Sequence, residues 1–219
     1  MKEKGSNGFS QNYWDENYAE PKTMDGIGNA KEHIRYLRAY FAVDIVDIST
    51  IADLGAGLGH MFRQSLSIFR PYKALAIEPS DFAYKKLTSA KSSRITSTEL
   101  DIKQIDLLSW CQDPNEEFIY DLGICTSVFQ YLKSDEIKMI LPILSHRFKY
   151  LYFSVPTDME LGRQRREIEF YDKYALRRSR SAYQKLLAPY FTVISSRVLE
   201  SKKHFNQETS FFTDLLFRN

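Results

Sequence analysis

Three glycines at alternate positions follow a short apolar run near residue 50, and this pattern is the part of the sequence best suited to bind a ligand. The run, residues 50–54, reads as a buried strand that carries an acidic residue, Asp53, and the glycines stand at positions 55, 57 and 59. Glycine lets the backbone approach a ligand closely and take conformations that a side chain forbids. A strand that leads into a glycine turn and then a helix is typical of nucleotide-sized sites in α/β folds.

The spacing of the glycines narrows the class of nucleotide. The dinucleotide fingerprint G-x-G-x-x-G requires glycine where this chain has His60, and the third glycine comes one residue earlier, at Gly59. The pattern D-x-G-x-G-x-G, which begins at Asp53, resembles the first motif of the class I S-adenosylmethionine (SAM) dependent methyltransferases. The resemblance implies that the methionine arm of SAM is bound here, by Asp53, Gly55, Ala56, Gly57 and Gly59.

Two further acidic residues follow predicted strands. Glu78 comes directly after the second predicted strand and is followed by Pro79. A carboxylate in this position can accept two hydrogen bonds from a ribose diol, although a solvated surface acid gives the same pattern. Asp101 ends the predicted third strand, residues 95–100. The resemblance implies that Asp101 accepts a hydrogen bond from the adenine amino group and that Ile102 packs on the adenine face.

The fourth predicted strand, residues 119–125, is followed by a polar pair. The resemblance implies that Thr126 and Ser127 place backbone groups against the methionine arm. It also implies that Gln130 and Tyr131 begin the wall beside the transferred methyl group. No residue is assigned as catalytic, and His60 fits a surface position at the start of a helix equally well. The candidates that could face the reacting atoms are His60, Gln130, Tyr131 and Tyr171.

The order of the predicted elements favours an α/β fold. Five predicted strands alternate with helices, which indicates a parallel sheet with helices on both faces. Two later strands, residues 191–199 and 210–217, have no helix between them and are expected to pair antiparallel at one edge. The expected fold is a three-layer sandwich with a mostly parallel seven-stranded sheet and a terminal antiparallel strand pair. Such a sheet resembles that of the class I methyltransferases. The first five predicted strands are residues 50–54, 74–77, 95–100, 119–125 and 150–155.

One domain is expected. Residues 1–28 are interpreted as an N-terminal tail and lid segment, and residues 29–219 as the methyltransferase domain, with a helical insertion at about 157–180. Contacts with the methyl acceptor are expected from the lid and the insertion, which carry aromatic residues. Within the insertion, Arg163 and Glu167 are four residues apart and can pair along a solvated helix.

The composition limits the class of partner. The formal net charge of +2 is too small to indicate binding to nucleic acid or to an anionic membrane. No uncharged apolar run reaches the roughly 18 residues that a transmembrane helix needs. The four histidines are scattered without the spacing of metal ligands, so no metal is expected. Cys111 and Cys125 lie in a predicted helix and a predicted strand, which favours buried thiols in a reducing cytoplasm.

These features together predict a SAM-dependent methyltransferase with S-adenosylhomocysteine (SAH) as product. Methyl transfer from a sulfonium is an in-line displacement with an activated donor, so positioning and water exclusion are the main tasks of the protein. The motifs therefore identify the donor, and a small-molecule acceptor is expected, bound by a monomer or a dimer. The alternatives are a non-catalytic SAM-binding or scaffold protein, an NAD(P)-binding oxidoreductase, and a methyltransferase that acts on protein or RNA.

Overall fold

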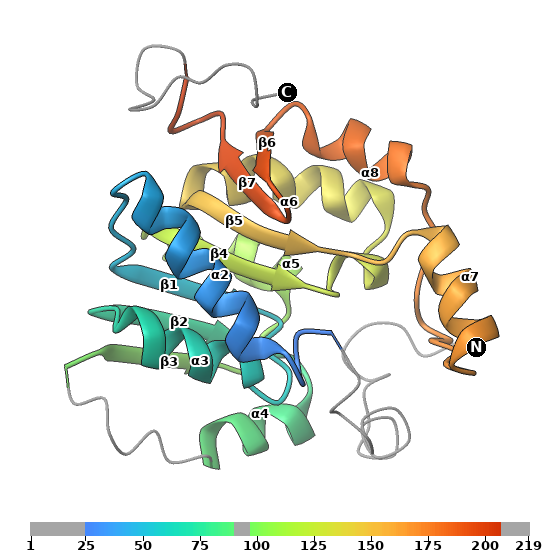
Figure 1. The fold of residues 1–219 in the computed structure, drawn as a ribbon, viewed down its shortest axis with the longest axis horizontal. Helices are drawn as coiled ribbons and strands as arrows, with labels where there is room; N and C mark the ends of the chain where they lie inside the picture. The colour runs from blue at the N-terminus through green and yellow to red at the C-terminus, as the bar shows by residue number, and fades with distance from the viewer. Residues whose placement is uncertain (1–24, 90–96, 207–219) are drawn as a thin grey trace. The chain divides into compact units, whose positions relative to one another are not determined.

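The computed structural model describes residues 25–89 and 97–206 (Figure 1). Its strands form a seven-stranded sheet. The strand order is β3-β2-β1-β4-β5-β7-β6. The predicted fold class, a mostly parallel sheet with a terminal antiparallel pair, is confirmed. The strands are β1 (Thr50–Leu54), β2 (Lys73–Ile77), β3 (Glu99–Lys103), β4 (Tyr120–Thr126), β5 (Phe148–Ser154), β6 (Phe191–Ser195) and β7 (Val198–Ser201).

The chain divides into two compact units, and the first holds residues up to Trp110 together with residues 120–124 of β4. Its strands are parallel: β1 pairs with β2 and with β4, and β2 pairs with β3. Every residue of β1 is buried, as is typical of a parallel strand that is covered on both faces. The helices of this unit are α2 (Ala30–Val43), α3 (His60–Phe69), α4 (Asp81–Ser89) and the start of α5 (Leu107–Gln112).

The strand order reverses between β1 and β4, because β2 lies on one side of β1 and β4 on the other. In open α/β sheets, ligands bind at the carboxyl ends of the strands beside such a reversal. Asp53 pairs with Ile124 near the carboxyl end of both strands. The topology therefore places the glycine turn at the expected ligand-binding edge of this unit.

The boundaries of the third strand differ from the prediction. β3 covers Glu99–Lys103, so Asp101 lies in the middle of the strand and not after its end. Glu99, Leu100 and Asp101 are exposed, and β3 is the edge strand of the sheet. An edge strand with exposed polar positions has a weak apolar pattern, which is why its bounds were hard to predict.

The second unit holds residues 111–119 and the chain from Cys125 onward. It contains β5, β6 and β7, in which β7 pairs antiparallel with both β5 and β6. Cys111 and Cys125 are both buried thiols. The helices of this unit are η3 (Phe129–Tyr131), α6 (Ser134–Arg147), α7 (Asp158–Glu167) and α8 (Arg180–Leu187).

The terminal antiparallel pair is built from other residues than predicted. The single strand expected over residues 191–199 is wrong, because the chain turns back after Ser195 and β6 and β7 form a hairpin. Arg197 takes a left-handed conformation in the turn, with φ of 62°. No glycine or proline marks this turn, so the sequence lacked the usual signal for it. The strand predicted over residues 210–217 lies outside the described residues.

Helix α6 carries Pro142 inside it and continues to Arg147. The prediction for the insertion needs correction. The insertion expected at 157–180 is helical only in α7, which begins with a capping box between Thr157 and Glu160. Residues 168–179 then run without regular structure to α8. The division into a tail (1–28) and a domain (29–219) stays a prediction.

Candidate functional site

The turn after β1 is formed by glycines in conformations that other residues rarely adopt. Gly55, Gly57 and Gly59 have φ angles of 83°, 55° and 79°. The backbone N–H groups of Gly55 and Ala56 both donate to the carbonyl oxygen of Ile77, each at 2.9 Å. Gly55 and Ala56 are thus tied to the end of β2 by their own backbone. This explains why the motif needs glycine locally.

Glu78 follows β2 and holds the same turn from its side chain. Its Oε2 accepts the N–H of Gly57 at 2.8 Å, and its Oε1 accepts the N–H of Ser80 at 2.8 Å. Glu78 is only 5% exposed. Burial raises the pKa of its carboxyl group, and the two backbone hydrogen bonds act against this rise. A carboxylate oxygen has two lone pairs, so each oxygen of Glu78 can accept one more hydrogen bond.

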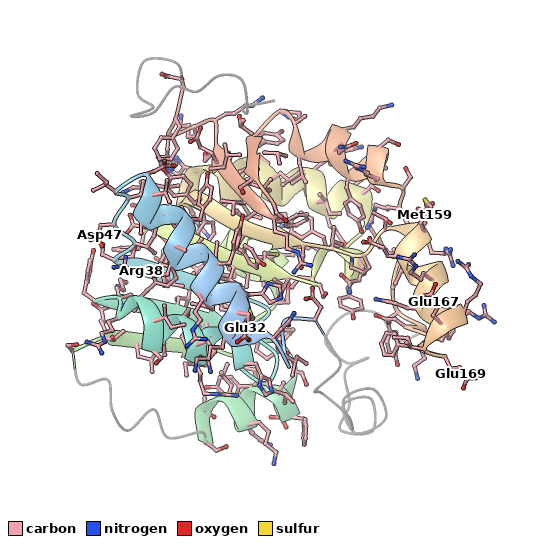
Figure 2. The ribbon with its side chains drawn as sticks, in the orientation of Figure 1. Glu32, Arg38, Asp47, Met159, Glu167 and Glu169 are labelled. Carbon is pink, nitrogen blue, oxygen red and sulfur yellow. The ribbon has the colours of Figure 1, made fainter. Side chains whose placement is uncertain are left out.

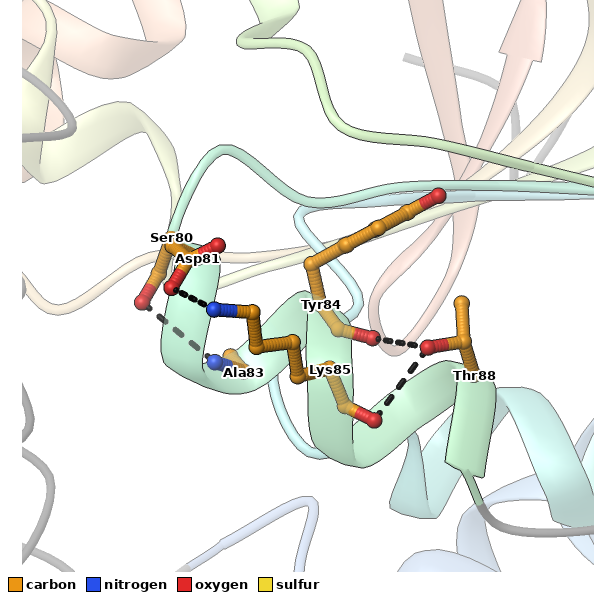
Figure 3. Close-up of polar contacts among 6 residues, drawn as sticks. All are labelled: Ser80, Asp81, Ala83, Tyr84, Lys85 and Thr88. Carbon is orange, nitrogen blue, oxygen red and sulfur yellow. Dashed lines mark hydrogen bonds and ion pairs between the residues drawn. The ribbon is translucent and has the colours of Figure 1, made fainter.

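Helix α4 fixes the position of Glu78 from the other side. Ser80 caps this helix: its Oγ accepts the N–H of Ala83 at 3.4 Å (Figure 3). On the exposed side of the helix, Lys85 pairs with Asp81 at 2.7 Å (Figure 3). Because only Pro79 separates Glu78 from the cap, the carboxylate cannot move without disturbing the first turn of α4. The predicted site residue Pro79 therefore has a structural role as a rigid link.

Asp53 lies two residues before the first glycine of the turn, and its carboxyl group is buried. It is 3% exposed, and its Oδ2 has no hydrogen-bond partner among the described residues. Burial, and secondly the negative charge of Glu78, raise the pKa of Asp53 to about 8. Such a group favours a nearby positive charge, because a cation would compensate the charge of its ionised form.

A side chain at Gly59 would be crowded by two neighbouring side chains. A Cβ atom at this position would lie 2.3 Å from Cδ1 of Leu87 in α4 and 2.7 Å from Nη1 of Arg63. Gly59 thus lets α4 approach the turn closely. His60 follows as the first residue of α3 and is partly buried. Burial, and secondly the charge of Arg63, lower the pKa of His60, so its imidazole is neutral near pH 7.

The two residues predicted to contact adenine lie on opposite sides of β3, because successive side chains alternate along a strand. Ile102 and Ala56 pack against the same buried cluster, which includes Phe62. Ile102 is thereby brought towards the glycine turn. Asp101 is half-exposed and lies 3.5 Å from Nζ of Lys103. Its predicted role has less structural support than that of Ile102.

The predicted residues after β4 lie in the second unit. Thr126 is the last residue of β4 and is partly buried. Ser127 is exposed and left-handed, with φ of 56°, and its N–H donates to the carbonyl oxygen of Ser154 at 2.8 Å. A serine in this conformation is uncommon, and such strain is frequent at functional turns.

The remaining candidates, Gln130, Tyr131 and Tyr171, differ in their surroundings. Gln130 is 4% exposed, and its Oε1 has no hydrogen-bond partner in the described part of the chain. The hydroxyl of Tyr131 donates to Oδ2 of Asp172 at 2.7 Å. Tyr171 is exposed, and the guanidinium of Arg165 lies 5.1 Å from its ring centroid.

The insertion carries exposed charged and apolar side chains. Arg163 pairs with Glu167 at 3.1 Å, as the spacing predicted. Met159 and Glu167 lie on α7, and Glu169 lies just beyond its end (Figure 2). Sequence reasoning missed one residue at the end of this segment, the buried Arg178. Its position among many arginines gave no signal of burial.

Across residues 25–89 and 97–206, no cluster of three or more His, Cys, Asp or Glu residues is placed to hold a metal ion. Within the same ranges, no helix is long and apolar enough to span a membrane.

Comparison with protein-family models and with curated proteins gives no match for this chain. Among solved structures, an S-adenosylmethionine-dependent methyltransferase from Clostridium acetobutylicum ATCC 824 aligns with a TM-score of 0.62. The alignment covers 93% of this chain and 95% of that chain at 14% identity. The fold is the class I methyltransferase fold.

Two further structures have the class I methyltransferase fold in common with this chain. The plantazolicin methyltransferase BpumL, in complex with a monoazolic desmethylPZN analog and SAH, aligns with a TM-score of 0.63. That alignment covers 82% of this chain and 69% of BpumL at 13% identity. Magnesium protoporphyrin IX methyltransferase (ChlM) from Synechocystis PCC 6803, with bound SAH, aligns with a TM-score of 0.56 over 90% of this chain and 94% of that chain, at 16% identity.

Proposed function

We propose that this protein is a SAM-dependent methyltransferase, of the EC 2.1.1 type, that releases SAH. The observation that carries the proposal is the buried carboxyl group of Asp53, whose Oδ2 is unpartnered among the described residues directly before a turn of three left-handed glycines. SAM supplies an activated methyl group on a sulfonium and also bears an ammonium group. A ligand with this charge compensates the ionised form of Asp53 through space.

Glu78 is suited to bind the ribose of SAM through hydrogen bonds. Its two oxygens each retain one lone pair after they accept the N–H groups of Gly57 and Ser80. Two adjacent hydroxyl groups can use these lone pairs. Gly55, Ala56, Ile102, Thr126 and Ser127 complete the proposed cofactor set, and Asp101 keeps its proposed contact with adenine.

The proposed acceptor is a small molecule. Two of the structurally similar proteins are a magnesium protoporphyrin IX methyltransferase and a methyltransferase in complex with a desmethylPZN analog, and their folds agree with most of this chain. The near-neutral charge of this chain supports an acceptor other than nucleic acid. The buried thiols of Cys111 and Cys125 support a reducing, cytoplasmic setting.

The turn geometry favours SAM over NAD(P). Cδ1 of Leu87 fills the space beside Gly59 that a Cβ atom would take. The next residue is His60, at the position where a dinucleotide fingerprint needs glycine. A scaffold protein that binds SAM without catalysis remains the second candidate. The scaffold function is supported because no residue is assigned as a general base, and methyl transfer to an unreactive acceptor needs one.

Calorimetry with SAM, SAH and NAD tests the cofactor. We expect SAM and SAH to bind and NAD to bind at least about tenfold more weakly. Gly57→Arg is expected to abolish binding of SAM while thermal unfolding remains cooperative. Gly26→Arg is the matched control, at a left-handed glycine where an added Cβ atom has no neighbour within 4 Å. Tighter binding of NAD than of SAM would sink the proposal.

Isotope-labelled SAM tests catalysis. The labelled methyl group is expected to pass to a compound in a small-molecule extract, and the same extract with Gly57→Arg is the control. Binding of SAM without transfer to small-molecule, protein or RNA fractions would favour a scaffold protein that binds SAM without catalysis. Transfer confined to the protein or RNA fraction would contradict the proposed small-molecule acceptor.

A further inference from the structure

The short turn after β4 is held by one buried cation from the segment that follows β5. Nη1 of Arg178 donates to the carbonyl oxygen of Phe129 at 3.1 Å, and Nη2 donates to the carbonyl oxygen of Leu132. Nε donates to Oγ of Ser134 at 3.2 Å, at the start of α6. Arg178 is 9% exposed, and it also contacts Tyr183, whose hydroxyl accepts from Nη1 at 3.4 Å.

Two other hydrogen bonds tie the same turn to the same segment. The N–H of Leu176 donates to the backbone carbonyl of Gln130 at 2.7 Å. The hydroxyl of Tyr131 donates to Asp172. Residues 129–132 and residues 172–178 are therefore joined at several points. Within this second unit, a displacement of one segment must displace the other.

The chemistry of these contacts requires arginine. Its guanidinium presents five N–H donors in a planar fork, whereas a lysine ammonium presents three donors from one point. The acceptors of Arg178 are separate groups: the carbonyls of Phe129 and Leu132 and two hydroxyls. All four acceptors are uncharged, so geometry, and not charge neutralisation, determines the arrangement. A lysine keeps the charge and cannot span the four acceptors.

The arrangement bears on Gln130, which lies between the two carbonyls that Arg178 holds. The buried Oε1 of Gln130 lacks a hydrogen-bond partner within the described ranges, so its position depends on the backbone of the turn. Tyr131 is next to it and is fixed by Asp172. The segment 172–178 thereby determines where both side chains lie.

We propose that Arg178 is a positioning residue for the acceptor: it holds the Phe129–Leu132 turn so that Gln130 and Tyr131 face the acceptor in the geometry that methyl transfer needs. This inference rests on the proposed methyltransferase function. It assigns to Arg178 no contact with cofactor or acceptor. Loss of the brace therefore reduces transfer and leaves cofactor binding intact.

The first test measures the brace without any ligand. Amide hydrogen exchange is compared for wild type, Arg178→Lys and Arg180→Met, the last an exposed arginine two residues away. We expect Arg178→Lys to speed exchange at the amides of Tyr131, Leu132 and Leu176 together, and Arg180→Met to leave them unchanged. Unchanged exchange at these amides in Arg178→Lys overturns the inference.

The second test separates positioning from folding. SAH affinity is measured by calorimetry, and transfer is measured with labelled SAM and a small-molecule extract. For Arg178→Lys we expect SAH affinity within about twofold of wild type and transfer reduced about 10- to 100-fold, the usual effect of misplacing a reacting group. Asp172→Ala removes the acceptor of the Tyr131 hydroxyl, leaves Tyr131 itself unchanged and is expected to reduce transfer less. A folding defect in Arg178→Lys cannot hide the result, because Asp172→Ala tests the same brace from the other segment.

Equal loss of SAH affinity and transfer in Arg178→Lys overturns the inference, because Arg178 is then a general folding residue. Full transfer in both variants overturns it as well. If the wild type binds no SAH, the proposed function fails instead, and the exchange experiment still decides whether the brace exists.

Discussion

Glu78 and Gly57 are joined by a hydrogen bond of 2.8 Å between the carboxylate Oε2 and the backbone N–H. Through this bond, a residue expected to bind ribose also holds the turn expected to bind the methionine arm. The proposed ribose contact and the local structure of the turn therefore depend on the same carboxylate. The consequences of this sharing can be measured.

Glu78→Gln is expected to weaken both the fold and the cofactor site. The amide places an NH₂ group against one of two backbone N–H donors, those of Gly57 and Ser80, so one buried hydrogen bond is lost. The unfolding free energy should fall by about 1–3 kcal/mol, the cost of an unsatisfied buried polar group. SAM affinity should fall about tenfold or more.

Thermal unfolding and calorimetry measure these effects. Glu99→Gln is the matched control, because Glu99 is an exposed carboxylate that pairs with Lys73. Its replacement should change the unfolding free energy by less than about 1 kcal/mol. A Glu78→Gln protein with unchanged stability would show that the turn does not depend on this carboxylate.

Asp53→Asn is expected to change how stability depends on pH. The pKa of Asp53 is raised from 3.8 to about 8 in the folded protein. Between these pH values the folded protein keeps a proton that the unfolded chain has released, so the unfolding free energy falls as pH rises and levels off above about 8. Asn removes this dependence, so the unfolding free energy of the variant should rise relative to that of wild type as pH rises from 4 to 8.

The Tm difference between Asp53→Asn and wild type is measured at several pH values across this range. Each kcal/mol recovered should raise Tm by about 2–4 °C for a chain of this length. Asp47→Asn, at an exposed aspartate, is the control and should show no such gain. Parallel Tm curves for Asp53→Asn and wild type would contradict the assignment of a raised pKa.

The affinity for SAM should rise with pH through the same residue. Below about pH 8, Asp53 is protonated in the free protein and must ionise to attract a cation. The dissociation constant should therefore fall, by at most about tenfold per pH unit, as pH rises from 6 towards 8. Calorimetry in buffers of different ionisation enthalpy should also detect proton release. Asp53→Asn retains only the pH dependence that comes from SAM itself, and equal slopes for the two proteins would refute the coupling.

Gly59→Ala is expected to destabilise the protein through packing with Leu87. Gly59 and Gly26 have nearly equal φ angles, 79° and 80°, but only Gly59 has neighbours within 4 Å of an added Cβ atom. Gly26→Ala thus measures the backbone strain alone. Gly59→Ala should cost about 1–3 kcal/mol more than this control, as overpacking does. Leu87→Ala should cost less in the Gly59→Ala protein than in wild type, because it removes the crowded side chain. Denaturant unfolding of wild type, the two single variants and the double variant measures this coupling.

The sequence predicted the elements whose signals are local. β1 and the glycine turn follow from contiguous residues, and the structure has both. The turn between β6 and β7 could not be predicted in the same way. It contains no glycine, and Arg197 adopts its left-handed conformation within the pairing of the hairpin. Long-range pairing determines such a turn, and a local pattern does not record it.

The candidate site was predicted unevenly for the same reason. Asp53 and Glu78 were found because each belongs to a strand end with a recognisable pattern, whereas the partner of Glu78 at Gly57 could not be predicted. Arg178 was missed because its burial depends on carbonyl groups more than 40 residues earlier in the chain. Asp101 was misplaced because its strand is exposed and its apolar pattern is weak.

If the turn that Glu78 holds binds SAM, the supply of SAM should affect how long the protein survives in a cell. A ligand that binds only the folded chain stabilises it by about 2.7 kcal/mol at a concentration 100 times its dissociation constant. Chaperones and proteases act on the small unfolded fraction, so a gain of this size raises abundance. If the glycine turn binds SAM, cellular levels of this protein should rise and fall with SAM, and the amount of enzyme would then report the methylation capacity of the cell.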